Sequence, residues 1–218
     1  MKSLVIINFK TYKETIGDKS LALAKKIAKV KKDGYEIVVA PSLLTMKEVA
    51  DKTNLTVFAQ HVDPILDGSN TGSIAVGDLK AMGAKGVILN HSEKKLPFQI
   101  LKETIELCRK KALITVVCAS KISEIKMAAQ LNPDYVAYEP KELIGGDVSV
   151  TEARPHIIVK AVEIVKSINR NVKVLAGAGV HSQEDLGLAL LLGAQGVLIG
   201  HAVSKANNPQ KFLEKMLL

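Results

Sequence analysis

Eight short apolar runs recur along this 218-residue chain, and they constrain its fold more than any other feature of the sequence. Most of the runs are nearly continuous in Val, Ile and Leu rather than alternating between apolar and polar residues. Such runs are typical of strands that are buried on both faces of a parallel sheet. We therefore predict strands at Leu4–Ile7, Ile37–Ala40, Thr56–Ala59, Gly86–Leu89, Ile114–Cys118, Tyr135–Tyr138, Val172–Ala176 and Gly196–Ile199.

Segments with apolar residues three and four positions apart follow the runs, which indicates amphipathic helices. They are Ser20–Val30, Thr45–Lys52, Val76–Met82, Pro97–Lys111, Ile122–Leu131, Thr151–Ile168, Gln183–Leu192 and Gln210–Leu217. Eight strand–helix units in succession predict an α/β fold, a closed (β/α)8 barrel. A doubly wound sheet is the competing fold, but no G-x-G-x-x-G sequence follows the first strand to support it.

Composition favours one ordered domain that spans residues 1–218. The chain is 47% hydrophobic and 24% charged, with no low-complexity block and no Pro/Gly/Ser-rich linker. No apolar stretch reaches the ~18 residues that a membrane span requires. The apolar run before Asn8 is too short for a signal peptide. We therefore expect no membrane association, and Cys108 and Cys118 are expected to be reduced thiols of a cytoplasmic protein.

The formal charge of +8 raises the possibility of a nucleic-acid partner. The lysines are scattered, however, and aromatic residues are only 4% of the chain, so no basic surface with interleaved stacking residues is predicted. Solvated helix faces explain the lysines better. A net positive field would also attract a small anionic substrate.

Polar residues and glycines gather where the predicted strands end, which is where a (β/α)8 barrel carries its function. Asn8 and Lys10 end the first strand and, being two residues apart, can face the same pocket. His91 follows the fourth strand and Glu139 follows the sixth. Glycine turns follow the last two strands, where barrels commonly bind phosphate through backbone N–H groups, at Gly177-Ala178-Gly179 and Gly200-His201.

The segment after the sixth strand resembles a catalytic base beneath a lid. Glu139 ends a buried run, and Pro140 prevents the strand from continuing because it has no backbone donor. A short loop then closes at Gly145-Gly146. A strand that merely stops at a polar residue is the alternative, and the other strand ends favour the catalytic interpretation.

Taken together, these motifs resemble the triosephosphate isomerase family over nearly the full chain. The resemblance rests on their order and strand-end placement, at Asn8-Phe9-Lys10, His91-Ser92-Glu93-Lys94, Ala137-Tyr138-Glu139-Pro140 with Ile144-Gly145, and Gly177 to Val180. The short chain and the Leu89-Asn90-His91 variant look like the compact archaeal branch. The resemblance implies a single-domain TIM barrel and, for that branch, a homotetramer, with a dimer as the alternative.

The resemblance also implies the role of each site residue. Glu139 would be the base that moves a proton between two carbons of a triose phosphate, and His91 would polarise the carbonyl and enediolate oxygens. Lys10 would supply positive charge, Asn8 would orient the substrate, and Glu93 would hold Lys10 by an ion pair. Phosphate contacts would come from Lys10 and Asn8 and from the backbone of Ile144, Gly145, Gly179, Gly200 and His201.

This reaction requires a base and stabilisation of an oxyanion, and it requires neither metal nor redox cofactor. We accordingly predict no metal site and no cofactor, and the expected partner is a small phosphorylated triose. The enediolate could expel phosphate, so a lid that excludes water has a chemical purpose.

Two positions depart from the family pattern. Gly146-Asp147 stands where the lid usually ends in Thr-Gly, and His201 stands where a small residue is usual. Asp147 and His201 are predicted to border the same phosphate pocket.

The alternatives to a triosephosphate isomerase are an aldose–ketose isomerase of amino-acid biosynthesis and a catalytically silent phosphate-binding barrel. The first would pair acidic residues at strands 1 and 5, and the second would not need Lys10, His91 and Glu139.

Overall fold

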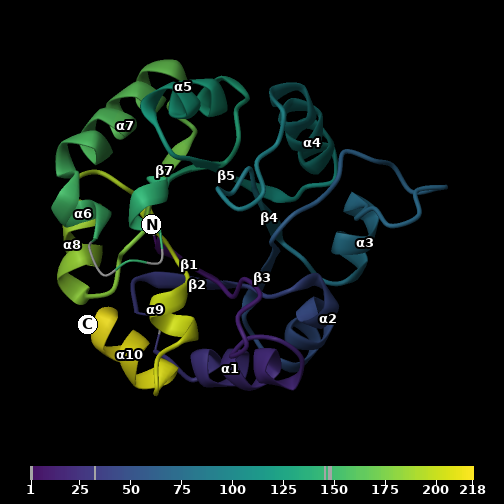
Figure 1. Ribbon diagram of the computed structural model, residues 1–218, viewed down its shortest axis with the longest axis horizontal. Helices are drawn as coiled ribbons and strands as arrows, with labels where there is room; N and C mark the ends of the chain where they lie inside the picture. Colours follow the sequence, from purple (N-terminus) through teal and green to yellow (C-terminus); the bar gives the residue numbers. More distant parts are fainter. Residues whose placement is uncertain (1, 32, 145, 147–148) are drawn as a thin grey trace.

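The computed structural model describes residues 2–31, 33–144, 146 and 149–218, and it confirms the predicted (β/α)8 barrel. All eight strands pair in parallel with their sequence neighbours, and β1 pairs with β8 to close the barrel (Figure 1). The strands are β1 Ser3–Asn8, β2 Tyr35–Ala40, β3 Thr56–Ala59, β4 Gly86–Leu89, β5 Ile114–Ala119, β6 Tyr135–Tyr138, β7 Lys173–Gly177 and β8 Gly196–Ile199.

The helices form a ring around the strands, as Figure 1 shows. Among the described residues, no helix is long and apolar enough to cross a membrane. The α-helices are α1 Asp18–Ala28, α2 Leu43–Lys52, α3 Val76–Ala81, α4 Phe98–Lys110, α5 Ile122–Gln130, α6 Val150–Ala153, α7 Pro155–Ile168, α8 Gln183–Leu191, α9 His201–Ser204 and α10 Pro209–Met216.

The helix predicted over Thr151–Ile168 is wrong in one respect, because the structure divides it into α6 and α7. Arg154 separates them with φ −142° and ψ 49°, outside the helical region. Pro155 causes the break, since its ring disfavours helical geometry at the residue before it. Two short elements were not predicted, the 3₁₀ turn η1 at Lys141–Leu143 and the four-residue helix α9.

Side chains point alternately to the two sides of each strand, and they form two separate packed regions. Side chains such as Ile6, Phe58 and Leu198 fill the barrel interior, and side chains of the opposite parity, such as Ile7 and Val57, pack against the helices. Both faces of every strand are therefore apolar, which explains the continuous runs in the sequence. Asn8 continues the inward parity of Leu4 and Ile6, and Glu139 continues that of Tyr135 and Ala137.

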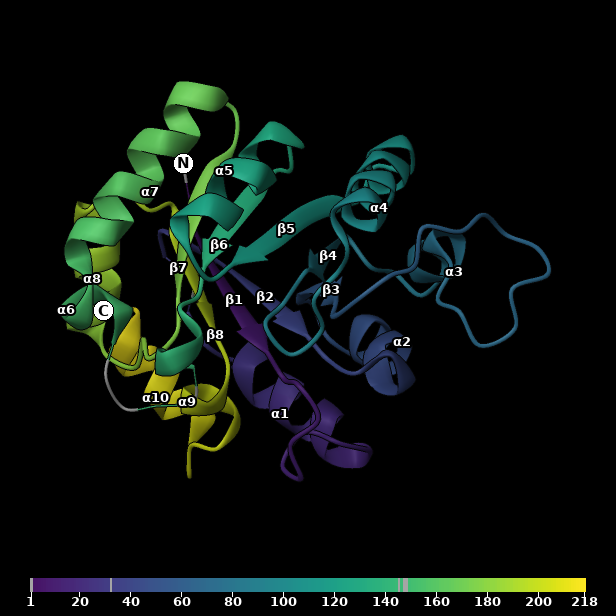
Figure 2. The same cartoon turned by 45° about the horizontal axis from the view of Figure 1, so that its top comes forward.

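The apolar face of α7 belongs largely to the core, since Ile158 and Val162 are 0% and 6% exposed. Leu191 at the end of α8 is 83% exposed. The connection from β3 to α3 extends away from the barrel in both views (Figures 1 and 2), and Leu66 within it is 67% exposed.

Candidate active site

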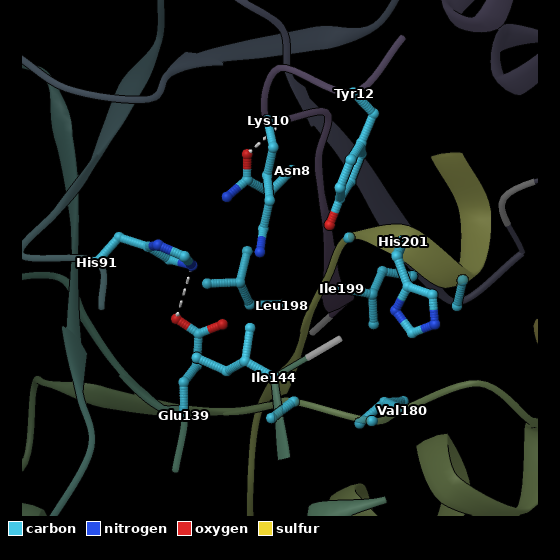
Figure 3. Close-up of a pocket in the computed structure, with 14 residues that line it drawn as sticks. Asn8, Lys10, Tyr12, His91, Glu139, Ile144, Val180, Leu198, Ile199 and His201 are labelled. Carbon is cyan, nitrogen blue, oxygen red and sulfur yellow. Dashed lines mark hydrogen bonds and ion pairs between the residues drawn. The ribbon is translucent and has the colours of Figure 1, made fainter. Parts of the chain in front are cut away.

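Glu139 lies directly after β6, with its carboxylate inside the mouth of the barrel (Figure 3). Its backbone N–H donates to the Ala119 carbonyl at 2.8 Å, which continues the β5–β6 ladder one residue beyond the strand. The residue is 6% exposed, and among the described residues no group hydrogen-bonds its Oε2 atom. Oε2 lies 3.6 Å from Nε2 of His91. A buried carboxylate oxygen without a donor is available to accept a proton.

Gly177 at the end of β7 leaves the room that the Glu139 side chain occupies. A Cβ atom at position 177 would lie 2.4 Å from Glu139 Cγ and 3.1 Å from its Cδ. Real Cβ contacts are never this short, so a larger residue would displace the carboxylate. The sequence showed this glycine only as part of a turn, and its packing against Glu139 emerges from the structure.

Gly177→Ala is therefore expected to lower kcat by up to about 100-fold, because a misplacement of ~1 Å can cost that much. Gly187→Ala is the matched control. It lies in α8, where an added Cβ meets no atom within 4 Å, so it should keep full activity and raise stability by ~0.5–1 kcal/mol. Steady-state kinetics and thermal melts of both variants test this. Parental kcat in Gly177→Ala would show that this contact does not position Glu139.

His91 presents one ring nitrogen to the pocket and the other to the backbone. The Glu93 N–H donates to His91 Nδ1 at 3.2 Å, within a turn closed by a 2.8 Å bond from Lys94 N to the His91 carbonyl. A ring nitrogen that accepts a hydrogen bond carries no proton, so this bond assigns the neutral tautomer with the proton on Nε2. Nε2 is the atom that faces Glu139.

Asn90 holds the turn before His91, a role that sequence reasoning missed. Its φ of +57° is left-handed, a conformation that asparagine tolerates better than most residues. The amide donates to the Cys118 carbonyl at 2.9 Å and accepts from Leu96 N at 3.0 Å. These bonds link the β4 turn to β5, and the asparagine at a strand end was the only signal of them.

Lys10 points its ammonium group into the same space as His91 and Glu139 (Figure 3). Its φ is +49°, and two bonds hold this strained backbone: Lys10 N donates to Asn8 Oδ1 at 3.0 Å, and Gln60 Nε2 donates to the Lys10 carbonyl at 3.1 Å. Burial acts to lower the pKa of Lys10, but the hydrogen bond to Glu93 and neighbouring negative groups outweigh it and raise the pKa. The ammonium therefore stays charged.

Glu93 joins the cation to the imidazole at the edge of the pocket. Its Oε1 lies 2.7 Å from Lys10 Nζ, and its Oε2 lies 3.5 Å from His91 Nδ1. The Glu93 side chain is 56% exposed, whereas that of Lys10 is 12% exposed. The ion pair that the family resemblance implied is present, and it fixes the direction of the buried ammonium.

The other end of the pocket is lined mainly by the turns after β7 and β8. Ala178 and Gly179 are consecutive left-handed residues, with φ of 71° and 67°, and successive N–H groups in such turns can form an anion-binding concavity. The predicted residues Ile144, Gly179, Gly200 and His201 line this end. Gly145 and Asp147 lie outside the described residues, and so does the predicted proximity of Asp147 to His201.

Comparison with known proteins agrees with this geometry. The sequence model of the family described as triosephosphate isomerase matches residues 3–216. The chain belongs to the triosephosphate isomerase family.

Curated relatives named triosephosphate isomerase match nearly the whole chain. The protein of Methanothermus fervidus is 40% identical over 217 residues, covering 99% of this chain and 98% of its own length. That of Methanocaldococcus jannaschii is 41% identical, covering 98% of each. That of Archaeoglobus fulgidus is 40% identical, covering 98% of this chain and 96% of its own. The predicted family and its isomerase class are confirmed, and the barrel of amino-acid biosynthesis is not supported.

Asp185 ties the start of α6 to the turn before α8. Its Oδ1 accepts from Thr151 Oγ1 at 2.9 Å, and its Oδ2 accepts from Ser182 Oγ at 3.0 Å and from His181 N at 3.1 Å. Ser149 Oγ lies 2.6 Å from Thr151 Oγ1. Burial acts to raise the pKa of Asp185, but hydrogen bonds from these hydroxyls and this backbone outweigh it and lower the pKa. The carboxylate thus fixes the start of α6 to the turn before α8.

Asp185→Asn is expected to lower the free energy of unfolding by about 1.5–3 kcal/mol at pH 7, because hydrogen bonds to a charged acceptor are lost. The folded-state pKa is below that of the unfolded chain, ~3.9, so the stabilisation is complete above that value. It disappears as pH falls through the folded-state pKa. Urea unfolding from pH 7 to pH 3 measures the difference, with the exposed Asp78→Asn on α3 as control. An equal deficit at pH 3 and pH 7 would exclude the ionised carboxylate as its source.

The two cysteines are buried, and the structure gives them no reactive environment. Burial raises the pKa of the Cys108 thiol to about 12. Burial also raises the pKa of Cys118 well above its usual range, and the neighbouring Glu139 carboxylate adds to the effect. Both thiols therefore stay protonated at neutral pH, and neither is a nucleophile for the isomerase family's chemistry.

Proposed function

We propose that this chain interconverts glyceraldehyde 3-phosphate and dihydroxyacetone phosphate in glycolysis and gluconeogenesis. The observation that carries the proposal is the Glu139 Oε2 atom, which is buried, has no hydrogen-bond donor among the described residues and lies 3.6 Å from His91 Nε2. A base and a neutral donor that face one space fit proton transfer next to a carbonyl group.

Glu139 takes the proton from the hydroxyl-bearing carbon beside the carbonyl. The electron pair of the broken C–H bond forms the carbon–carbon double bond of an enediolate, and the carbonyl oxygen becomes the oxyanion. The protonated carboxyl group then returns a proton to the adjacent carbon. Proton transfer between the two oxygens completes the exchange of aldehyde and ketone, and no atom or electron is gained or lost.

His91 donates its Nε2–H to the oxygen that becomes negative. The 3.2 Å bond from Glu93 N to Nδ1 leaves Nε2 as the ring nitrogen that carries the donated hydrogen. Lys10 supplies fixed positive charge to substrate and intermediate, and Asn8 orients the substrate oxygens. Glu93 keeps the Lys10 ammonium in place through its 2.7 Å ion pair.

The phosphate group occupies the end of the pocket formed by the turns after β7 and β8. Backbone N–H groups of Ile144, Gly145, Gly179, Gly200 and His201 bind its oxygens. The loop from Pro140 to Ser149 acts as the lid that retains phosphate and excludes water. Asp185 anchors the end of that loop through Thr151.

A coupled assay tests the function directly. Glyceraldehyde 3-phosphate is supplied, and the dihydroxyacetone phosphate formed is reduced by glycerol-3-phosphate dehydrogenase while NADH absorbance is followed. Turnover of this substrate, but not of the larger phosphorylated aldoses of amino-acid biosynthesis, supports the proposal. Binding of the triose phosphate without turnover would instead identify a silent phosphate-binding barrel.

The assembly belongs to the same proposal: a homotetramer of cytoplasmic chains, each a single domain over residues 1–218, with no nucleic-acid partner. Leu191 is 83% exposed at the end of α8, and Ile157, Leu188 and Leu192 nearby are only partly buried. An apolar helix face of this kind is suited to contact between copies. Light scattering at micromolar concentration is expected to give four times the chain mass of 23.5 kDa. Twice that mass would indicate a dimer, and a stable monomer would rule out the assembly.

A further inference from the structure

Tyr12 lies two residues beyond Lys10 and lines the same pocket, yet the roles assigned above do not use it. The Tyr12 carbonyl accepts from Thr15 N at 2.8 Å and from Thr15 Oγ1 at 3.0 Å. Thr15 Oγ1 also lies 2.8 Å from the Phe9 carbonyl, to which it donates, and Thr15 is 0% exposed. The turn that carries Tyr12 is therefore fixed to the end of β1.

The Tyr12 ring lies close to two ammonium groups. Lys205 Nζ lies 4.6 Å from the ring centroid, and Lys10 Nζ lies 5.9 Å from it. Cations at such distances interact favourably with the ring face and restrict its orientation. They also withdraw electron density from the ring, which strengthens the phenol hydroxyl as a donor.

The phenol oxygen points into the pocket, between Lys10 and His201 (Figure 3). Within the part of the chain that the structure describes, no hydrogen bond occupies this oxygen. The predicted phosphate-binding turns, which carry Gly179 and Gly200, line the same pocket. The hydroxyl thus adds a donor from the β1 side to a pocket otherwise supplied by backbone N–H groups after β7 and β8.

We propose that Tyr12 is a phosphate ligand of the substrate, with its hydroxyl donating to a phosphate oxygen and with Lys205 holding its ring. This inference rests on the proposed function, because that function places phosphate at this end of the pocket. A phosphate group presents three strong acceptor oxygens, so it can accept donors from more than one side of the pocket. A charge-assisted O–H···O bond from Tyr12 is among the stronger hydrogen bonds that proteins form.

Tyr12→Phe separates the hydroxyl from the ring, because phenylalanine keeps the contacts with both lysines. It is expected to lower kcat/KM for glyceraldehyde 3-phosphate by about 10-fold or more, the usual effect of one hydrogen bond to a charged group. Turnover of glyceraldehyde, which has no phosphate, should stay within about twofold of the parent. Tyr35→Phe is the matched control, because Tyr35 is the first residue of β2 and the pocket lies at the other end of the strands. This variant should leave the kinetics with both substrates unchanged.

Affinity for inorganic phosphate, measured by ³¹P NMR titration, tests the ligand role without turnover. Tyr12→Phe should bind phosphate about 10-fold more weakly than the parent. Lys205→Met should weaken it by a smaller factor, and Lys211→Met should leave it unchanged. Parental phosphate affinity in Tyr12→Phe would overturn the proposal, and so would an equal loss with both substrates, which indicates a structural role. An inactive parent would contradict the proposed function, and the phosphate titration would still decide the role of Tyr12.

Discussion

Glu139→Gln is expected to lower kcat by about 1,000-fold or more, because a positioned general base contributes roughly 10²- to 10⁴-fold. The amide has the size of the carboxylate and fits the same space beside Gly177, where Glu139 Cγ leaves no room for another atom. Binding of a non-reacting substrate analogue should therefore change little. The measurement is steady-state kinetics in both directions, together with the inhibition constant of that analogue.

Two further variants make this result specific. Glu139→Asp keeps the base but withdraws it by about one methylene, so kcat should fall by about 100-fold, less than in Glu139→Gln. Glu106→Gln on the exposed face of α4 is the matched control and should behave as the parent. A loss of analogue affinity as large as the loss of kcat would mean that Glu139 serves binding rather than proton transfer.

Lys10→Met is expected to lower kcat/KM by about 100- to 1,000-fold, the usual range when one preorganised group that stabilises developing charge is removed. Methionine keeps most of the length of the side chain but removes the charge. The variant should still fold, because the partner that it leaves, Glu93, is 56% exposed and can be solvated. Steady-state kinetics measures the loss, and circular dichroism checks the fold.

Lys13→Met is the control for Lys10→Met, because the Lys13 side chain is 88% exposed and has the same charge. It should retain kcat/KM within about twofold, as expected for an exposed charge on the protein surface. If both variants lose activity equally, the effect comes from net charge and not from the ammonium group inside the pocket. A parental kcat/KM in Lys10→Met would remove Lys10 from the catalytic group.

The strands were predictable because a closed parallel sheet buries both faces of each strand and therefore favours apolar residues throughout it. Runs such as Val136–Tyr138 are apolar on both faces, and the residue that follows each run lies at the barrel mouth. That rule led to Glu139, directly after β6, and to His91, two residues after β4, and the family resemblance supplied their roles. The strand predictions were correct to within two residues at either end.

Other features depend on contacts between segments that are distant in the sequence. The role of Gly177 follows from its contact with Glu139, which lies directly after the neighbouring strand β6. Asn90 bonds the Cys118 carbonyl on β5, and Asp185 bonds the Thr151 hydroxyl on α6, so the residue types alone did not indicate these distant partners. The helix break at Arg154 could have been predicted, because a proline follows it. The apolar periodicity across the break outweighed that signal.

The central claim is that hydrogen moves between the two carbons as a proton carried by Glu139. Isomerisation of glyceraldehyde 3-phosphate in D2O tests it most directly, with the dihydroxyacetone phosphate product analysed by NMR. A carboxyl group that holds the proton can exchange it with solvent before returning it, so the account predicts that a measurable fraction of product carries deuterium at C1. Product that contains only protium at C1, formed at the full rate, would show direct hydride transfer between the carbons and would contradict the account.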